Sequence, residues 1–502
     1  MITHFDVIIV GAGISGVGAA YHLQRSLPGK SFALLEGRDG IGGTWDLFRY
    51  PGIRSDSDMY TLGFPWRPWR HSKLIADGAS IKQYVEDSAH EQGIDNKVRF
   101  GTRVRRVSWS SEHNRWTLEC ESSRGPLRYS CGFLLMCAGY YRYETAYTPH
   151  FAGMREFAGR LVHPQFWSDD IDYAGKRVVV IGSGATAVTL VPALAEKAAH
   201  VTMLQRSPSY VFSAPAEDPV AKLLRSYLPE HVAYLVTRWI SIVLSSAFYK
   251  LTRTWPKIAN KMLIDLVQEA LGTNIDVSKH FTPRYNVWDQ RVCLIPDGDL
   301  FQALLGEHAS VVTEEIERFT RDGIKLKNGQ ELAADLIVTA TGIELQMLGG
   351  IEVEVDGKRV DINQSVLYKS CMFSDVPNLA TFFGYINASW TLKADMTARW
   401  LCRLLKHMDE NDVQRCVPRV SDPAMATRPM LELTSGYIQR ALSRLPQQGT
   451  KWPFKLYQNY LPDRFLTSFS KIDDGILELT HVQPSASRGQ SSYSTSCYET
   501  EN

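Results

Sequence analysis

The sequence predicts an α/β protein made of two nested Rossmann-like dinucleotide-binding domains with a helical insertion. A buried strand, a glycine-rich turn and a helix follow one another near residue 11, and the same pattern recurs near residue 182. Each pattern is followed by short alternating segments that return to its own sheet. The first half resumes after the second ends, so the two domains are nested. A chain of 502 residues is long enough for two or three domains with substantial cores.

The first glycine-rich turn lies in FDVIIVGAGISGVGAAYHL. A strand is expected over residues 6–10, and a helix from the turn to about Leu27. Gly11 permits the tight turn, Gly13 lets a pyrophosphate approach the backbone, and Gly16 lets the helix pack close to the strand. The phosphates would then lie at the helix N-terminus, where free N–H groups favour anions.

A second strand and a long loop complete this first site. The strand, SFALLE, ends in Glu36, at the place where a carboxylate binds ribose hydroxyls. Residues 40–58, GIGGTWDLFRYPGIRSDSD, are too irregular for a helix or strand, and a long loop of that kind is usually functional. Between residues 98 and 137, RVRRVSW, RWTLECE, LRYSC and FLLMCAG predict a β-meander that returns to the main sheet.

The second glycine-rich turn lies in KRVVVIGSGATAVTLVPAL and has the motif Gly182-x-Gly184-x-x-Ala187. Its second strand, HVTMLQRSP, ends without an acidic residue and has Arg206 and Ser207 there instead. A guanidinium can grip a 2′-phosphate that a carboxylate would repel, which favours NADPH over NADH. The alternative is a solvated cation at a strand end. Two dinucleotide sites suggest a permanently held flavin and a nicotinamide that delivers hydride.

The connector between the two sites contains aromatic, glycine and histidine residues that a simple polar linker would not need. FAGRLVHPQFW, residues 157–167, places Phe157, Gly159, His163 and Trp167 at the spacing FxGxxxHxxxW. This spacing resembles the fingerprint of Baeyer–Villiger monooxygenases, which join a FAD domain to an NADPH domain. GTWDLFRYPGIRSD, residues 43–56, is similar to the second pattern of that family, and the resemblance runs from about residue 5 to about residue 480. Ser168 departs from the usual end of the fingerprint.

The subgroup is indicated by three further stretches. GGTWDLFRYPGIRSDSDMYTLGF, VWDQRVCLIPDGDLF and GYINASWTLKAD look closest to the bacterial ethionamide-activating monooxygenases. Trp167 argues against the related flavin-containing monooxygenases, which usually carry another aromatic residue there. Phe48 replaces an Asn that is common in cyclic-ketone enzymes, so their substrate range is not carried over.

The resemblance implies an NADPH-dependent flavin monooxygenase that inserts one oxygen atom from dioxygen into ketones through a peroxyflavin. The products would be esters or lactones, and sulfides or thioamides would also be oxygenated. One alternative is an enzyme whose main role is oxygenation of nitrogen or sulfur. A remote alternative is a non-catalytic nucleotide-binding redox sensor. A disulfide reductase is disfavoured because the sequence has no Cys-x-x-Cys.

The resemblance also implies site residues. Arg291, in WDQRVC, would be the active-site cation beside the developing oxyanion, and Asp56 would lie near the flavin and orient it. The alternatives are that Arg291 pairs structurally with Asp289 or another carboxylate, and that Asp56 is a turn former. His163 as a general base is disfavoured against a hinge or structural role. The expected FAD contacts are Gly11, Gly13, Ser15, Gly16, Glu36, Thr44, Trp45, Asp46, Asp56 and Val104. The expected NADP contacts are Arg54, Ser55, Gly182, Ser183, Gly184, Thr186, Ala187, Arg206 and Ser207.

Composition limits the remaining possibilities. A formal net charge of +1 implies no general attraction to nucleic acid. The eight cysteines are scattered, which indicates reduced thiols, a cytoplasmic protein and no metal site. No signal peptide is expected, and the apolar stretch of residues 239–249 is shorter than the roughly 20 residues that span a bilayer. A buried or interfacial helix fits that stretch, with peripheral membrane contact as the less favoured alternative.

The expected domain organisation follows the two nested motifs. The FAD domain comprises residues 1–145 and 343–483. The linker and the NADPH domain comprise residues 146–213 and 286–342, interrupted by a helical insertion over residues 214–285 that covers the substrate cleft. Residues 484–502 form a Ser-rich, disordered tail.

Overall fold

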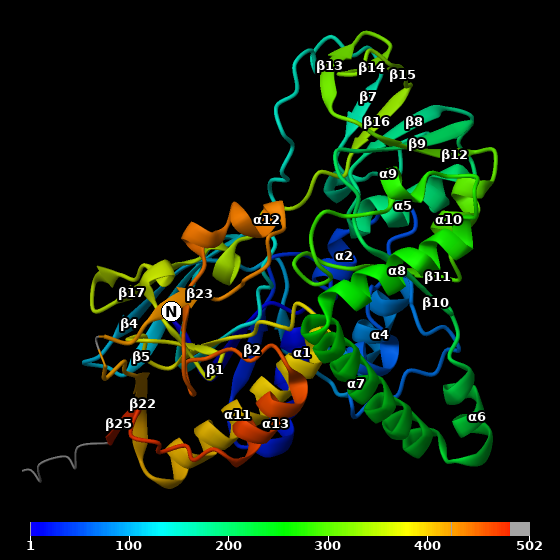
Figure 1. The fold of residues 1–502 in the computed structure, drawn as a ribbon. Coiled ribbons are helices and arrows are strands. Elements are labelled where there is room, and N and C mark those ends of the chain that lie inside the picture. Colours follow the sequence, from blue (N-terminus) through cyan, green and yellow to red (C-terminus); the bar gives the residue numbers. More distant parts are fainter. Residues whose placement is uncertain (1, 423, 482–502) are drawn as a thin grey trace, which may run out of the picture.

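A computed structural model describes residues 2–422 and 424–481 of the chain. Two α/β lobes lie side by side, connected by extended segments, and a group of helices lies beside both (Figure 1). The predicted fold class is confirmed: in each lobe the strand before a glycine-rich motif pairs in parallel with its neighbours in the sheet. The predicted tail lies outside the described residues.

The first lobe is built on a large mixed sheet with the strand order β18-β17-β4-β5-β6-β1-β2-β3. The first strand, β1 (Thr3–Val10), runs parallel to β2 (Phe32–Leu35) on one side and to β6 (Gly125–Met136) on the other. Its last four residues are buried, as the unbroken apolar run VIIV predicts for a strand covered on both faces. Helix α1 (Ile14–Ser26) packs against α11 (Trp390–Glu410), and together they belong to the core beside β1.

The predicted meander is present, with one difference. LRYSC and the FLLM of FLLMCAG belong to a single long strand, β6, because antiparallel pairing with β5 at its start passes directly into parallel pairing with β1. The 40–58 loop also contains one helical turn, α2 (Thr44–Leu47), which sequence irregularity did not predict. The remaining strands of this lobe are β3 (Val98–Arg99), β4 (Arg103–Ser110), β5 (Arg115–Ser122), β17 (Glu352–Val355), β18 (Lys358–Arg359), β19 (Leu367–Tyr368), β20 (Met372–Phe373), β21 (Leu379–Thr381), β22 (Val413–Pro418), β23 (Thr427–Pro429), β24 (Gln447–Gly449) and β25 (Leu477–His481). The remaining helices are α3 (Met59–Leu62), α4 (Gly78–Glu91), α12 (Gly436–Gln439) and α13 (Tyr460–Phe469).

The second lobe contains a five-stranded sheet with the order β12-β9-β8-β16-β7, all parallel. Its strands are β7 (Arg160–Val162), β8 (Arg177–Ile181), β9 (His200–Gln205), β12 (Ala309–Thr313) and β16 (Leu336–Thr339). The strands β13 (Ile316–Thr320), β14 (Gly323–Leu326) and β15 (Glu331–Ala333) form a small antiparallel sheet at the top of this lobe (Figure 1). Helices α5 (Ala185–Ala195) and α10 (Asp299–Leu305) pack together, and β10 (Val211–Ala214) pairs with β11 (Cys293–Pro296).

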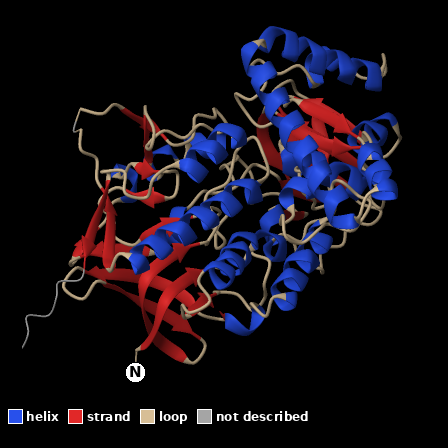
Figure 2. Ribbon diagram, turned by 90° about the horizontal axis from the view of Figure 1, so that it is seen from below, coloured by secondary structure: helices blue, strands red, loops and turns tan. Residues whose placement is uncertain are grey.

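Four helices lie between β10 and β11 in the chain: α6 (Pro219–Tyr227), α7 (Glu230–Thr254), α8 (Pro256–Leu271) and α9 (Val277–His280). Seen from below, helices occupy the region between and beside the strands of the two lobes (Figure 2). The apolar stretch of residues 239–249 is part of the 25-residue α7, which is long and apolar enough to cross a membrane by length and composition. The 239–249 stretch alone is shorter than the roughly 20 residues that span a bilayer, as expected, but the helix that contains it is longer than expected.

The chain crosses between the lobes twice, and the two crossings pair with each other. Tyr141 and Leu345 form an antiparallel bridge. The N–H of Arg142 donates to the carbonyl of Glu344 at 2.9 Å, and the guanidinium of Arg142 lies 3.2 Å from the Glu344 carboxylate. The lobes are thus connected by a short two-stranded ribbon and not by independent linkers.

The cysteines within the described residues are all buried in the cores of the two lobes. Burial raises the pKa of each of these thiols above its usual value. These cysteines are Cys120, Cys131, Cys137, Cys293, Cys371, Cys402 and Cys416.

Candidate active site

A cavity of about 1130 Å³ lies between the two lobes and extends from one glycine-rich turn to the other. Most of the residues expected at the site line it: Gly11, Gly13, Ser15, Glu36, Thr44, Trp45, Arg54, Ser55, Asp56, Val104, His163, Gly182, Ser183, Gly184, Thr186, Arg206, Ser207 and Arg291. The cavity therefore brings together residues from the first turn, the irregular loop, the connector, the second turn and the segment after the helical insertion.

The first glycine-rich turn shows why two of its three glycines are needed by the fold itself. Gly11 has φ +104°, and a Cβ there would lie 2.5 Å from the carbonyl oxygen of Cys137. A Cβ on Gly16 would overlap the carbonyl oxygen of Gly11. Gly13 is different, because its φ is −78° and the nearest atom to an added Cβ is the Cα of Gly43 at 3.5 Å. Gly16 holds the helix against the strand and does not line the cavity.

Glu36 lies at the end of β2 with its carboxylate held by two backbone groups. Oε2 accepts from the N–H of Ala12 at 2.7 Å, and Oε1 accepts from the N–H of Arg38 at 2.9 Å. Burial raises the pKa of this carboxyl group, while the two backbone donors oppose the rise. The carboxylate is thereby fixed at the edge of the cavity, where it could accept hydrogen bonds from a ribose.

The second glycine-rich turn repeats this arrangement. Gly182 has φ +146°, and a Cβ there would overlap the carbonyl of Ala340. At Gly184 the φ is −84°, and no atom lies within 4 Å of an added Cβ. The protein itself therefore does not require a glycine at 184, whereas a pyrophosphate lying against the backbone would. Ala187, in place of the third glycine, is fully buried and does not line the cavity.

The arginines expected near the nicotinamide dinucleotide have different surroundings. Arg206 is exposed and lies at the cavity edge with Ser207, beside Glu314 and Glu315. Arg54 forms a two-point ion pair with Asp299 at the first turn of α10. Arg206 is thus open to a phosphate, while Arg54 already has a carboxylate partner.

The clearest polar contact in the cavity joins Arg291 to Asp56. Nη2 of Arg291 lies 2.6 Å from Oδ2 of Asp56. The Asp56 carboxylate raises the pKa of the guanidinium further above its usual value. Asp289, the alternative partner, instead accepts from Arg253 at 2.8 Å. The pair thus places a permanent cation at the cavity wall, oriented by a carboxylate from the irregular loop.

Three aromatic residues around this pair carry no sequence motif of their own. The rings of Tyr140 and Trp390 stack with centroids 4.9 Å apart, and Nε1 of Trp390 donates to Oγ of Ser15 at 2.7 Å. Tyr437, from α12, also lines the cavity. These residues come from the first crossing, the start of α11 and the C-terminal part of the chain, so only the tertiary structure brings them together. The stretch GYINASWTLKAD, which contains Trp390, was the one sequence signal for any of them.

The connector residues His163 and Gln165 join the connector to the two crossings between the lobes. Nε2 of His163 lies 3.1 Å from the carbonyl oxygen of Gly342, and Nδ1 accepts from the N–H of Gln165 at 3.2 Å. The side chain of Gln165 donates to the carbonyls of three residues of the first crossing, Arg142, Tyr143 and Thr145. Both imidazole nitrogens are thus engaged, which suits a joining role and leaves neither free to act as a base.

The other fingerprint residues lie away from the cavity. The rings of Phe157 and Phe319 are 6.4 Å apart, and a Cβ on Gly159 would lie 2.5 Å from the carbonyl of Asp335. Trp167 packs edge-on against Tyr173. The fingerprint therefore fixes β7 within the five-stranded sheet of the second lobe. Of the four fingerprint residues, only His163 lines the cavity.

Besides Gly16 and Ala187, two further expectations differ from the structure. The Asp46 carboxylate does not line the cavity, because it faces Arg38 at 2.7 Å and Lys82 at 3.0 Å. The helical insertion does not cover this cavity either: none of its described residues lines it, and α7 instead packs against α3 and α13 of the first lobe. The inserted helices bury their inner faces elsewhere, which periodicity alone does not locate.

Comparison with known proteins gives consistent matches. The family model described as flavin-binding monooxygenase-like matches residues 70–415, and a model for an NAD(P)-binding Rossmann-like domain matches residues 9–73. The chain is 51% identical over 475 residues to the FAD-containing monooxygenase EthA of Mycobacterium tuberculosis, covering 94% of this chain and 97% of that protein. It is 46% identical to the probable FAD-binding monooxygenase AlmA of Acinetobacter baylyi, covering 94% and 96%.

Solved structures share the fold at lower identity. An oxidized steroid monooxygenase bound to NADP superposes with a TM-score of 0.74 at 23% identity, covering 96% of this chain and all of that chain. The open structure of cyclohexanone monooxygenase superposes with a TM-score of 0.73 at 19% identity, covering 95% and 100%. The two-lobed arrangement is therefore common to these proteins.

Proposed function

Because the chain belongs to the flavin-binding monooxygenase-like family and is an FAD-containing, NADPH-dependent monooxygenase, we propose that it catalyses Baeyer–Villiger oxidation of ketones. In this reaction a ketone, dioxygen, NADPH and a proton give an ester or lactone, NADP⁺ and water. We include sulfides and thioamides as further substrates, because the same activated oxygen reacts with a soft sulfur atom.

The arrangement of the two turns supports the assignment of the cofactors. FAD would lie at the first turn, with its pyrophosphate against Gly13 and a ribose at Glu36. NADPH would lie at the second turn, with its pyrophosphate against Gly184 and its 2′-phosphate at Arg206. When bound and reduced, FAD would activate dioxygen, which is the source of the transferred oxygen atom. Side chains of the protein would orient the substrate and stabilise the charge that develops on it.

The observation that carries the proposal is the ion pair between Arg291 and Asp56 at the wall of the shared cavity. Attack on a ketone carbonyl places negative charge on its oxygen, and a guanidinium already in position stabilises that charge without reorganising. One amino group of Arg291 is held by Asp56, and the hydroxyl of Tyr437 also contacts the guanidinium, which lies at the cavity wall with further N–H donors. Asp56 is therefore a positioning residue, and Arg291 is the proposed catalytic residue.

The aromatic lining supports an apolar substrate. Tyr140, Trp390 and Tyr437 line the cavity, together with Phe48 and Tyr141. Such walls exclude water from the reacting atoms and bind carbon-rich groups through their faces. The proposed substrate class is accordingly a ketone or sulfide with apolar substituents, and no cation or anion on the substrate is required.

The direct test is isotope incorporation. The holoenzyme would be supplied with NADPH, ¹⁸O₂ and a panel of linear, cyclic and aryl ketones and aryl sulfides, and products would be analysed by mass spectrometry. The expected result is an ester, lactone or sulfoxide that carries one ¹⁸O atom, formed in proportion to NADPH consumed. If only sulfoxides form across the panel, the main role is heteroatom oxygenation. If NADPH is consumed without any labelled organic product, the monooxygenase substrate class proposed here is wrong.

A further inference from the structure

Helix α7 carries apolar side chains on two faces, and only one of them is covered. Its inner face includes Ala233, Tyr234 and Ile242, which are buried. Its outer face exposes Val232, Trp239, Ile240, Val243, Leu244 and Leu251 at helical spacing, with Leu244 64% exposed. A helix that is apolar on both faces normally has both covered. The outer face of α7 therefore needs a partner that is not part of the chain's own core.

Neighbouring helices extend this exposed surface. Helix α13 packs against α7 and exposes Leu461, Phe465 and Phe469, four residues apart. The guanidinium of Arg464 in α13 lies 5.1 Å from the centre of the Trp239 ring. Helices α6 and α8, which also pack against α7, each expose a further apolar stripe: Val220, Leu223 and Tyr227 in α6, and Ile258, Met262 and Leu266 in α8. Together these outward residues of α6, α7, α8 and α13 are the apolar face.

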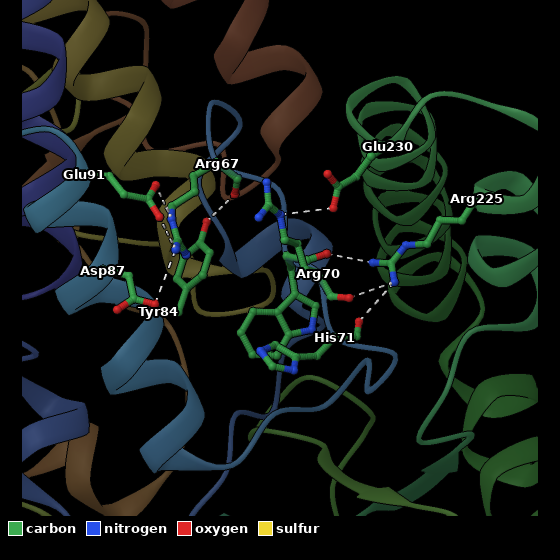
Figure 3. A network of polar contacts seen from close by, with 9 residues as sticks. Arg67, Arg70, His71, Tyr84, Asp87, Glu91, Arg225 and Glu230 are labelled. Carbon is green, nitrogen blue, oxygen red and sulfur yellow. Dashed lines mark hydrogen bonds and ion pairs between the residues drawn. The ribbon is translucent and has the colours of Figure 1, made fainter.

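A polar network holds the α6–α7 hairpin in place beside this face (Figure 3). The Arg225 guanidinium donates to the backbone carbonyls of Trp69, Arg70 and His71, with the shortest distance 2.7 Å to Trp69. Arg70 in turn pairs with Glu230 at the start of α7 at 3.2 Å. The hairpin is thus fastened at its turn to the first lobe, which keeps the apolar face directed outward.

The inner side of α7 is fastened as firmly. The guanidinium of Arg238, which is 4% exposed, donates to the carbonyls of Tyr60, Thr61 and Gly63. Withdrawing this helix to span a bilayer would break those bonds and take a charged side chain into hydrocarbon. A location in the plane of a membrane surface keeps the inner face on the protein and buries the outer one.

Charge identifies the kind of surface that would cover the apolar face. Residues 219–266 contain two acidic residues and seven Lys or Arg residues, of which only Arg238 is buried, although the whole chain has a formal net charge of +1. Lys222, Lys250 and Lys257 are exposed and form no ion pair with any residue the structure describes. We propose that the apolar face docks on an anionic lipid bilayer, with its apolar side chains in the interface and these lysines at the headgroups.

A second copy of the chain fits the apolar face less well than an anionic bilayer does. A two-fold related pairing of this face would bring the same lysines toward their own counterparts, and like charges in an interface oppose association. Anionic headgroups supply the opposite charge. Trp239 and Trp255, both more than 40% exposed, also have the mixed apolar and polar character that favours the membrane interface.

The test is vesicle flotation of the FAD-loaded, full-length protein at physiological salt. One vesicle type would contain phosphatidylcholine alone, and the other would also contain phosphatidylglycerol. We expect the protein to float with the anionic vesicles. Val243→Glu combined with Leu244→Glu should lower the bound fraction at least tenfold, because acidic groups replace apolar ones at the centre of the face. Lys250→Glu combined with Lys257→Glu should weaken binding to anionic vesicles by about fivefold for each lysine lost.

The matched control is Leu127→Glu, an exposed apolar residue on β6 in the first lobe, which should leave flotation unchanged. All variants should retain bound FAD and the parent rate with a water-soluble substrate, which separates this proposal from the proposed function. The proposal is overturned if the parent protein remains unbound with both vesicle types or binds both equally. It is also overturned if light scattering shows a dimer that Val243→Glu with Leu244→Glu converts to a monomer, because the occupant is then a second copy.

Discussion

The imidazole of His163 joins the fingerprint connector to the second crossing, because its Nε2 lies 3.1 Å from the carbonyl oxygen of Gly342. A carbonyl can only accept, so Nε2 carries the proton. Nδ1 is then the acceptor for the N–H of Gln165. The ring is therefore neutral and fully used in the folded protein.

This geometry predicts a pH dependence of stability. Burial lowers the pKa of His163, so the unfolded chain binds a proton more readily than the folded protein does. The stabilisation is complete above the unfolded pKa of about 6.5 and is lost as the pH falls through the lower folded pKa. Protonating Nδ1 removes the acceptor of the Gln165 N–H, which lowers the free energy of unfolding by about 0.5–1.5 kcal/mol. We expect Tm to fall less between pH 7.5 and 5.5 in His163→Gln than in the parent protein. Equal falls in both proteins would show that His163 does not contribute.

The Arg291 guanidinium should be needed for ketone oxygenation. Removing one preorganised donor to an oxyanion costs roughly 2.7–4 kcal/mol, so Arg291→Ala should lower the rate of ketone oxygenation about 10²- to 10³-fold. The measurement is single-turnover product formation after anaerobic reduction of FAD by NADPH. Arg291→Lys should recover little activity, since an ammonium does not reproduce the fork that meets Asp56.

Arg177→Ala is the matched control for Arg291, because this arginine forms an exposed ion pair with Asp335 outside the cavity. It should oxygenate at the parent rate. Oxygenation by Arg291→Ala at the parent rate would remove Arg291 from the mechanism.

The preference for NADPH over NADH should depend on Arg206. A hydrogen bond to a charged group contributes roughly 1.5–3 kcal/mol, so Arg206→Ala should lower the preference for NADPH, as the ratio of kcat/KM values, ten- to a hundred-fold. The rate with NADH should change little. An unaltered ratio would mean that Arg206 is only a solvated cation at the end of β9.

Gly184 and Gly16 should respond differently to substitution by alanine. Gly184→Ala meets no atom within 4 Å, so the variant should keep the parent Tm without nucleotide while its KM for NADPH rises at least tenfold. Gly16→Ala should destabilise the protein by on the order of 1–3 kcal/mol, because its Cβ would overlap the carbonyl of Gly11. A normal KM in Gly184→Ala would indicate that no pyrophosphate lies against this turn.

Sequence patterns located the parts of the site that depend on local geometry. A tight turn between a buried strand and a helix needs glycine at positions 11 and 182, and both have positive φ. Such requirements act between neighbours in the chain, so spacing alone reveals them. The pairing of Arg291 with Asp56 was expected from the family resemblance, since nothing in the spacing of these distant residues implies contact.

Other features depend on contacts that no local pattern encodes. The motif position of Asp46 suggested a cofactor contact, but Arg38 and Lys82 hold its carboxylate away from the cavity. Tyr437 reaches the cavity from α12, in a part of the chain without a recognisable motif. The helical periodicity of the insertion predicted helices but not which surface they cover, because amphipathic patterns identify a buried face without naming its partner.

The burial of the described cysteines has a consequence for an enzyme that handles activated oxygen. Hydrogen peroxide, which escapes whenever oxygen transfer fails, oxidises thiolates far faster than thiols. Raised thiol pKa values keep these side chains protonated, and the cores around them keep peroxide away. Cys293 shows this most clearly, since it lines the cavity wall yet remains a buried thiol. We therefore expect these buried thiols to react slowly with peroxide.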